Sequence, residues 1–257
     1  MTHKAVMDFT LEHNVALSPQ CSLLKLTPQG GTLPDIAPGQ FVQVEVPGSK
    51  TTYLRRPISV NYVQDQELWL LVRRAGAGTA ALCDTPQGAR LNLVLPLGHG
   101  FTTKLDDDCG SILLVGGGVG VAPLLQLGKV LSEQGRPVHF LLGARTVADV
   151  LELDMFKAIG RVDVATEDGS MGERGFVTQH SVLSQTVGHI ACCGPLPMMK
   201  AVAAIARQRG IDCEVSLENM MACGLGACLC CVEDTRDEGN VCVCKEGPVF
   251  NINRLKW

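Results

Sequence analysis

Cysteines near the C-terminal end carry the clearest chemical signal in this sequence. Six of the twelve cysteines lie between residues 223 and 244, and four of these follow a C-x4-C-x2-C…C spacing. The four are Cys223, Cys228, Cys231 and Cys244. This spacing is typical of the thiolate ligands of a 2Fe–2S cluster. Gly224 and Gly226 let the backbone fold closely, so that amide N–H groups can face the cluster sulfides. The spacing therefore predicts a one-electron redox centre.

Zinc, disulfides and unligated thiols are the other uses of these cysteines. Zinc usually sits between two C-x2-4-C pairs, and the second pair here would be Cys242 and Cys244, with only one residue between them. A disulfide framework is disfavoured because such frameworks belong to small secreted domains, and no signal peptide is expected here. Cys230 also competes with Cys231, which is preferred because it keeps the two-residue spacing. Cys244 is preferred over Cys242 because it opens the turn at residues 245–248.

The composition is that of an ordinary soluble protein. Charged residues make up 19% of the chain, apolar residues 46%, and the net charge is −4, which disfavours nucleic acid as a partner. The uncharged stretch at residues 109–128 is long enough to span a membrane, but six glycines and Pro123 divide it into strand, loop and helix. No membrane association is therefore expected. Abundant thiols outside the cluster pattern favour a reducing, cytoplasmic location.

The first part of the chain, residues 1–105, is expected to form an antiparallel β barrel. Short apolar or alternating segments recur between turn signals rich in glycine and proline, which is typical of a closed barrel. The expected strands cover residues 21–26, 40–46, 58–62, 68–73 and 90–94, with one helical turn at 79–82.

The next part, residues 106–217, alternates strands with helices and predicts a doubly wound parallel-sheet α/β domain, which binds ligands at the carboxyl ends of its strands. The expected strands are 112–115, 138–142, 162–166, 189–193 and 213–217, and the expected helices are 122–133, 148–159, 176–183 and 197–209. Residues 218–257 then form a small cysteine module.

Three segments of the expected barrel suit an anionic, flavin-type ligand. Arg56 follows Arg55 at the start of a strand. A guanidinium can donate two parallel hydrogen bonds to a phosphate. Ser59, three residues on, offers a hydroxyl for a ring nitrogen. Residues 76–79 allow close backbone approach at a helix start, which suits a diphosphate. A turn at residues 96–101 completes the set.

A glycine-rich loop in the α/β part lies between a strand and a helix, where a nucleotide phosphate is usually bound. Residues 116–123 do not match G-x-G-x-x-G, because Pro123 occupies the last position. The second strand also ends without the ribose-binding acid, so a simple Rossmann dehydrogenase is disfavoured. Cys193, at the end of the fourth strand, is either a ligand-facing thiol or a small buried hydrophobe.

In chain order these motifs resemble the ferredoxin–NADP reductase superfamily. The matching segments are residues 56–59, 76–79, 116–123, 168–175 and 193–195. The cysteine segments at 223–231 and 244–250 narrow the resemblance to the electron-transfer subunits of class 1B dihydroorotate dehydrogenases. The resemblance spans essentially the whole chain.

The resemblance implies FAD in the barrel, NAD(H) against the α/β domain and a 2Fe–2S cluster in the C-terminal module. The implied FAD contacts are Arg56, Pro57, Ile58, Ser59, Gly76, Gly78, Thr79 and Gly98. The implied NAD(H) contacts are Gly116, Gly117, Gly118, Gly120, Cys193, Gly194 and Pro195. Ser59 would lie at the reactive edge of the flavin and Cys193 under the nicotinamide, as the catalytic residues.

This chain departs from the family pattern at two positions. A third position bears on the choice between NADH and NADPH. Ile58 stands where the superfamily usually has a stacking aromatic residue, and His99 stands where an asparagine is expected. NADH is favoured over NADPH, although Arg145 is placed to meet a 2′-phosphate.

By the same resemblance, dihydroorotate is oxidised on a separate FMN-bearing catalytic subunit, and electrons pass through the cluster and FAD to NAD+ in pyrimidine biosynthesis. Two copies of each subunit are implied. One alternative is the flavin iron–sulfur subunit of a cytosolic hydrogenase or of a ferredoxin-dependent transhydrogenase. Another is a zinc-loaded, nucleotide-binding redox sensor.

Overall fold

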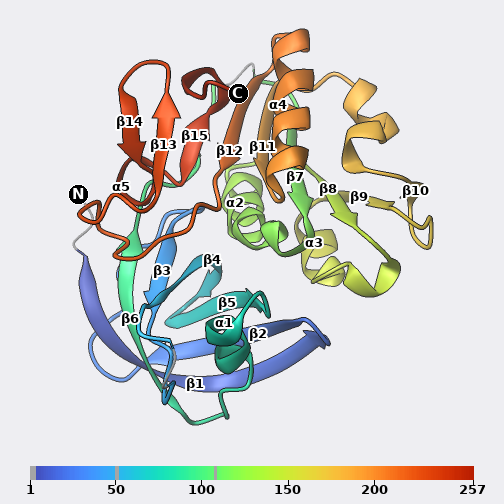
Figure 1. Ribbon diagram of the computed structural model, residues 1–257. Coiled ribbons are helices and arrows are strands. Elements are labelled where there is room, and N and C mark those ends of the chain that lie inside the picture. The colour runs from blue at the N-terminus through green and yellow to red at the C-terminus, as the bar shows by residue number, and fades with distance from the viewer. Residues whose placement is uncertain (1–3, 50–51, 107–108) are drawn as a thin grey trace.

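The computed structural model describes residues 4–49, 52–106 and 109–257 (Figure 1). The N-terminal barrel, blue to green in Figure 1, lies below the α/β domain, and the C-terminal hairpin, red, stands beside the sheet above one end of the barrel. The three parts expected from the sequence are therefore present and in contact.

The barrel is closed by six antiparallel strands in the order β1-β2-β5-β4-β3-β6, which confirms the predicted fold of this part. A short helix, α1 (Ala77–Cys83), precedes the last strand. The strands are β1 (Ala5–Ser18), β2 (Cys21–Pro28), β3 (Phe41–Val44), β4 (Arg56–Gln64), β5 (Glu67–Arg73) and β6 (Arg90–Leu97).

Strand β1 was not expected from the sequence. It is 14 residues long and pairs with both β2 and β6, with Phe9 and Leu11 fully buried. Its pairing with β2 shifts register after Leu11 and again after Ala16. These irregularities interrupt the two-residue alternation that marks a strand in sequence, so the segment lacks the usual pattern.

The α/β domain is built on a seven-stranded sheet in the order β10-β9-β8-β7-β11-β12-β15, parallel except for its last strand. The parallel strands are β7 (Ile112–Gly117), β8 (Val138–Ala144), β9 (Arg161–Thr166), β10 (Glu173–Arg174), β11 (His189–Cys193) and β12 (Asp212–Ser216). The helices are α2 (Ala122–Glu133), α3 (Leu153–Ile159) and α4 (Leu196–Arg209). The doubly wound arrangement is confirmed.

Two expected helices of this domain are shorter or of another type. Residues 176–183 form two 3-10 turns, at Val177–Gln179 and Ser181–Ser184, rather than an α-helix. His180 separates the turns, because its Nδ1 accepts a hydrogen bond from the Val182 amide, 3.1 Å away, and so begins a new turn. The segment expected as helix 148–159 begins as a 3-10 turn at Val147–Asp149, and its α-helix starts at Leu153.

The cysteine module consists of a loop, a hairpin and a returning strand. The hairpin pairs β13 (Val232–Thr235) with β14 (Gly239–Cys242), and the short helix α5 (Val243–Glu246) follows. Strand β15 (Val249–Asn251) then pairs antiparallel with β12, so this stretch completes the α/β sheet. The domain limits at residues 105/106 and 217/218 stay a prediction.

One hydrophobic cluster joins the three parts. It contains Phe41 from the barrel, Val215 from β12, and Val243 and Cys244 from the cysteine module, all buried. This shared core fixes the module against both other parts. No helix in the described part of the chain is long and apolar enough to cross a membrane.

Candidate functional site

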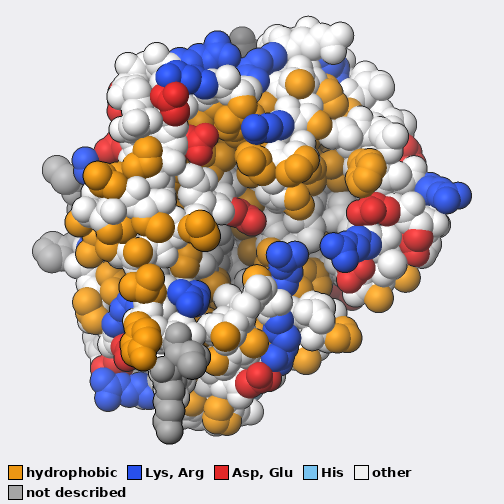
Figure 2. Space-filling model, viewed as in Figure 1, with side chains coloured by type: hydrophobic (Ala, Val, Ile, Leu, Met, Phe, Trp, Pro, Cys, Tyr) orange, Lys and Arg blue, Asp and Glu red, His pale blue; other side chains and the backbone are white. Residues whose placement is uncertain are grey.

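A pocket of about 210 Å³ lies where the three parts meet. The barrel contributes Pro57 and Ser59, and the 3-10 turn before α2 (Gly118–Val121) contributes Val119. Residues 217–219 and Pro248, which flank the cysteine loop, close the remaining side. Figure 2 shows the molecule hollowed between the barrel and the α/β domain, with hydrophobic side chains gathered around the hollow. A ligand bound here would touch all three parts at once.

Arg56 and the residue 76–79 loop come together at one end of the barrel. A Cβ on Gly78 would stand only 2.4 Å from the Arg56 Nε, so the guanidinium lies directly over this glycine at the start of α1. Thr79 Oγ1 accepts hydrogen bonds from the amides of Ala75 (2.9 Å) and Gly76 (3.1 Å), which fixes the loop. A guanidinium beside a fixed glycine loop is a suitable arrangement for a diphosphate.

Arg55, Ile58 and Gly98 have surroundings that differ from those of Arg56. Arg55 is held by the barrel, because its guanidinium donates to the Asn92 carbonyl (2.8 Å) and pairs with Glu45 (3.2 Å). Ile58 is buried in the barrel core and also lines the pocket. Gly98 packs against the turn of the cysteine module, since a Cβ there would meet the Gly247 carbonyl at 2.5 Å.

The expected nucleotide segments meet at the carboxyl ends of β7 and β11. These strands are neighbours, with Cys193 opposite Gly116. A Cβ on Gly120 would stand 2.6 Å from the Cys193 carbonyl oxygen and 2.6 Å from the Gly194 Cα, so only glycine permits this approach. Gly117 also lies close to Pro195, because an added Cβ would stand 3.1 Å from the proline Cδ. The structure therefore brings the two glycine-containing turns into direct contact.

The Cys193 thiol is enclosed by protein. The residue is 1% exposed, and burial raises the pKa of its thiol far above the usual value, with the nearby Glu218 acting in the same direction. The thiol is therefore neutral, and it serves in packing and as a weak hydrogen-bonding group, not as a nucleophile.

The cysteine loop directs backbone amides at its sulfurs. The Leu225 amide donates to Cys223 Sγ (3.3 Å) and the Gly226 amide to Cys244 Sγ (3.1 Å). The Cys244 amide donates to Cys231 Sγ (3.4 Å). The first of these hydrogen bonds is the main reason why the pKa of Cys223 is lowered to about 6. Amides aimed at sulfur are the surroundings that an anionic cluster requires.

The four expected ligands lie together in two pairs. Cys223 interacts with Cys228, and Cys231 interacts with Cys244. Burial, followed by the contact with Cys231, raises the pKa of Cys244 to about 12, so a thiolate at this position needs a cation beside it. Across residues 4–49, 52–106 and 109–257, no group of three or more His, Cys, Asp or Glu side chains is spaced to hold a single metal ion. Two thiol pairs suit a cluster of two irons.

Glu218 is a site residue that the sequence motifs did not reveal. It lines the central pocket next to Asn219, and burial raises the pKa of its carboxyl, with Arg73 opposing the shift. A charged residue two positions after the end of a buried strand, β12, is the available signal, because strand ends of a doubly wound sheet face the ligand.

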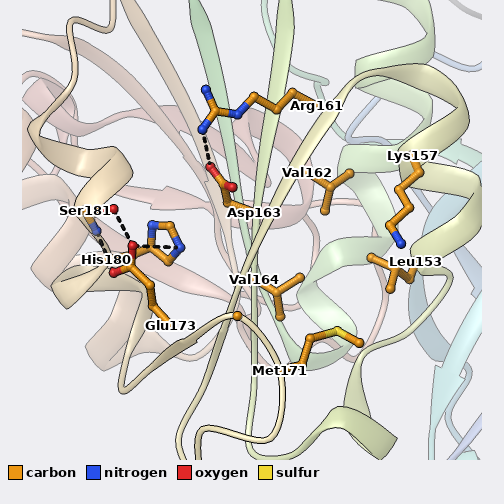
Figure 3. Close-up of a pocket in the computed structure, with 11 residues that line it drawn as sticks. Leu153, Lys157, Arg161, Val162, Asp163, Val164, Met171, Glu173, His180 and Ser181 are labelled. Atoms are coloured by element: carbon orange, nitrogen blue, oxygen red, sulfur yellow. Dashed lines mark hydrogen bonds and ion pairs between the residues drawn. The ribbon is translucent and has the colours of Figure 1, made fainter.

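A second hollow, of about 400 Å³, lies at the opposite edge of the sheet and contains none of the expected site residues. Figure 3 shows Glu173, His180 and Ser181 on one side of β9, with Leu153 and Lys157 on the other.

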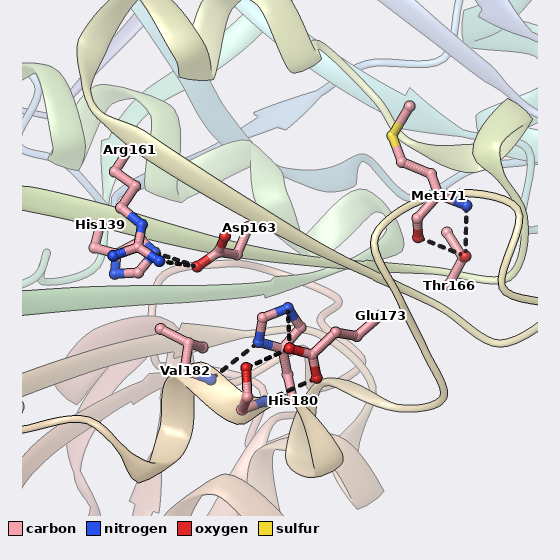
Figure 4. Close-up of polar contacts among 9 residues, drawn as sticks. His139, Arg161, Asp163, Thr166, Met171, Glu173, His180 and Val182 are labelled. Carbon is pink, nitrogen blue, oxygen red and sulfur yellow. Dashed lines mark hydrogen bonds and ion pairs between the residues drawn. The ribbon is translucent and has the colours of Figure 1, made fainter.

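The polar groups around this second hollow bind one another (Figure 4). Asp163 accepts from His139 (2.7 Å) and Arg161 (3.0 Å). Glu173 accepts from the Ser181 amide (2.9 Å) and lies 3.6 Å from His180. These contacts hold the sheet edge in place.

Two family models match this chain. The iron–sulfur cluster binding domain of dihydroorotate dehydrogenase B matches residues 218–256, and an oxidoreductase NAD-binding domain matches residues 114–204. Their positions coincide with the cysteine module and with the sheet that carries the glycine turns.

Among solved structures, the chain resembles that of the NADH-dependent reduced ferredoxin–NADP oxidoreductase, which was described for flavin-based electron bifurcation. The TM-score is 0.84 at 26% identity, over 97% of this chain and 90% of that one. The FAD/NAD-binding domain of the Vibrio cholerae nitric oxide dioxygenase, at 20% identity and a TM-score of 0.70, covers 81% of this chain and 98% of its own length and shares the fold.

Three curated relatives from different bacteria share the same functional description. Proteins of Lysinibacillus sphaericus (38% identity, 89% of this chain and 91% of the relative) and Bacillus velezensis (41%, 85% and 86%) are both described as the electron transfer subunit of dihydroorotate dehydrogenase B (NAD(+)). A Fusobacterium nucleatum protein with the same description is 34% identical over 95% of this chain and 96% of its own length. The chain therefore belongs to the family of dihydroorotate dehydrogenase B (NAD+) electron transfer subunits.

Proposed function

We propose that this chain receives electrons from an FMN-containing dihydroorotate dehydrogenase catalytic subunit and delivers them, through a 2Fe–2S cluster and FAD, to NAD+. The expected cofactors agree with the iron–sulfur and NAD-binding family models and with the flavin-dependent structural relative. A flavin exchanges electrons singly with a cluster and in pairs with a nicotinamide, so it belongs between the two.

The central pocket is the observation that supports this order of cofactors. Its lining comes from the barrel, from the 3-10 turn before α2 and from both flanks of the cysteine loop. A flavin ring placed here would lie next to the nicotinamide site on one side and the cluster on the other. In this proposal Arg56 and residues 76–79 hold the FAD diphosphate, and Ser59 binds the edge of the flavin ring.

On the nucleotide side, we assign Gly116, Gly117, Gly118 and Gly120 to the NAD(H) diphosphate. Gly194 and Pro195 would support the nicotinamide, with the neutral Cys193 thiol packed beneath them. The close contact of Gly120 with Gly194 supports a single binding surface made of both turns. These residues exclude water and orient the nicotinamide toward the pocket.

On the cluster side, we assign Cys223 and Cys228 to one iron, and Cys231 and Cys244 to the other. The pairwise contacts of the thiols and the three amide–sulfur hydrogen bonds support this division. Cys230 is exposed, whereas Cys231 is 2% exposed and faces Cys244, which supports Cys231 as the ligand.

An anaerobic NADH titration of the purified protein tests the relay. Bleaching of the flavin absorption together with the electron paramagnetic resonance (EPR) signal of a reduced 2Fe–2S cluster is expected. Flavin bleaching without that signal would contradict the cluster step, and metal analysis would then identify a zinc-loaded or empty site. Co-purification with a dihydroorotate dehydrogenase catalytic subunit, expected as two copies of each chain, separates this function from that of a hydrogenase or transhydrogenase subunit.

We also propose a cytoplasmic location. Cysteines outside the proposed cluster, among them Cys21, Cys83 and the exposed Cys230, form no disulfide, and thiols of this kind fit a reducing compartment.

A further inference from the structure

The side chain of Gln43, in strand β3, is buried without a hydrogen-bond partner. The residue is 0% exposed, and among the residues that the structure describes neither its Nε2 nor its Oε1 finds a partner. Buried amides are nearly always hydrogen-bonded, and an orphaned one indicates a partner that the protein itself does not supply.

Gln43 lies on the outer face of the barrel. Val42 and Val44, its neighbours in β3, belong to the barrel core, whereas Phe41 belongs to the core shared with the cysteine module. Because side chains alternate along a strand, Gln43 shares the outward side of Phe41. The barrel thus presents an amide to the module.

The cysteine loop closes directly over this amide. A Cβ on Gly224 would meet the Gln43 Cγ at 2.7 Å and its Nε2 at 2.9 Å. Gly224 also has φ +70°, a conformation that favours glycine, and it follows Cys223 in the chain. The orphaned amide therefore lies at the backbone of the loop that carries Cys223 and Cys228.

The flavin pocket is a less suitable source of the missing partner. Phe41 and Pro57 line that pocket, and Pro57 is the residue opposite Gln43 in the β3–β4 pairing, but Gln43 itself is not among the lining residues. Its contact is with the loop between two expected iron ligands.

We propose that the Gln43 side-chain amide donates a hydrogen bond to the sulfur of the 2Fe–2S site, to a cluster sulfide or to a cysteine ligand on the Cys223–Cys228 side. Gln43 is then a positioning residue from the flavin-binding barrel that acts on the cluster. A hydrogen bond to cluster sulfur stabilises the more negative, reduced state and raises the reduction potential. This inference rests on the proposed function, because it requires the cluster.

The test is an EPR-monitored redox titration of the complete protein in complex with its catalytic subunit. Gln43→Met keeps the length and burial of the side chain and removes the donor. We expect the ratio of reduced to oxidised cluster at a fixed potential to fall about tenfold, which is about 59 mV for a one-electron couple. The flavin midpoints, followed by absorption, should stay unchanged. Gln43→Glu, which adds a negative charge, should lower the cluster potential further.

Gln40→Met is the matched control. Gln40 is a buried amide just before β3, but its Nε2 donates to the Gly98 carbonyl (2.8 Å) and its Oε1 accepts from the Ala37 amide (2.8 Å). Its loss should leave the cluster potential unchanged. If Gln43→Glu fails to load the cluster, Gln43→Asn, which keeps a shorter amide, should give a shift smaller than that of Gln43→Met.

Two results would overturn the inference: an unchanged cluster potential and EPR line shape in Gln43→Met, or a shift confined to the flavin. If the wild-type protein itself lacks a 2Fe–2S signal, the proposed function fails as well, so the two failures are distinguishable.

Discussion

Asn61 in the barrel donates a hydrogen bond of 2.9 Å to Glu152 at the start of α3, across the contact between the barrel and the α/β domain. The Asn61 amide also lies 3.3 Å from the Ala122 carbonyl oxygen. Within the described residues, Glu152 Oε1 and Asn61 Oδ1 are buried without partners. This carboxyl therefore sits at the contact in surroundings that disfavour its charge.

Burial raises the pKa of Glu152 to about 7 from 4.5, against the hydrogen bond from Asn61 and the charge of Lys25. The folded state thus holds the proton more tightly than the unfolded state. The free energy of unfolding should fall as the pH rises from 4.5 to 7, by at most about 3 kcal/mol.

Glu152→Gln, which stays neutral, should match the wild type below pH 4.5 and have the higher melting temperature at pH 8. Thermal unfolding of the flavin-loaded protein at both pH values measures this difference. The exposed Glu133→Gln is the charge-matched control and should change stability equally at both pH values. A Glu152→Gln effect that is independent of pH would contradict the prediction.

Loss of the Arg56 guanidinium should weaken FAD binding. Arg56→Gln removes a charge-assisted contact to phosphate, and we expect the dissociation constant for FAD to rise about ten- to hundredfold. Gly78→Val should act in the same direction, because its Cβ would displace Arg56 from 2.4 Å. Flavin fluorescence during titration of the deflavinated protein measures both. Gly30→Ala, at an open turn with nothing within 4 Å, should bind FAD normally.

Serine substitutions should separate the ligands from their neighbours. Cys231→Ser should lose most of the iron and the 2Fe–2S absorption, because Cys231 is buried and faces Cys244. Cys230→Ser should retain both, since Cys230 is exposed. Iron analysis and visible spectra of anaerobically purified protein measure this. The reverse order of iron contents would reassign the ligand to Cys230.

A methyl group on Gly120 should separate the two nucleotide-binding turns. The Cβ of Gly120→Ala would lie 2.6 Å from backbone atoms of Cys193 and Gly194, so β7 and β11 must move apart at their ends. We expect the KM for NADH to rise about tenfold and stability to fall by about 1–3 kcal/mol, as for overpacking elsewhere. Flavin content should stay normal. Unchanged steady-state NADH oxidation would show that the turns do not bind the nucleotide together.

Much of this architecture can be predicted from the sequence because it depends on local patterns. The cysteine spacing, the glycine turns at strand ends and the strand–helix alternation all predicted elements that are present. Strand β1 lacks a recognisable sequence pattern because its bulges break the alternation. The predicted helix at residues 176–183 is wrong, because the His180 side chain accepts from the Val182 amide and begins a second 3-10 turn.

The residues that sequence reasoning missed depend on contacts between distant segments. In the sequence Gln43 is an ordinary strand residue. Its amide is covered by Gly224, which lies far along the chain. Asn61 and Glu152 are separated by 91 positions, and no motif links them. Only the assembled fold shows these side chains to be buried polar groups.

Strand β12 precedes the cysteines of the module, and strand β15, which follows them, pairs with β12. The segment with all six cysteines is thus tied at both ends to adjacent strands of one sheet. Fraying of β15 from the sheet edge would therefore release one end of the cysteine module, so the strength of the β12–β15 pairing limits how freely the redox centre can move relative to the nucleotide-binding sheet.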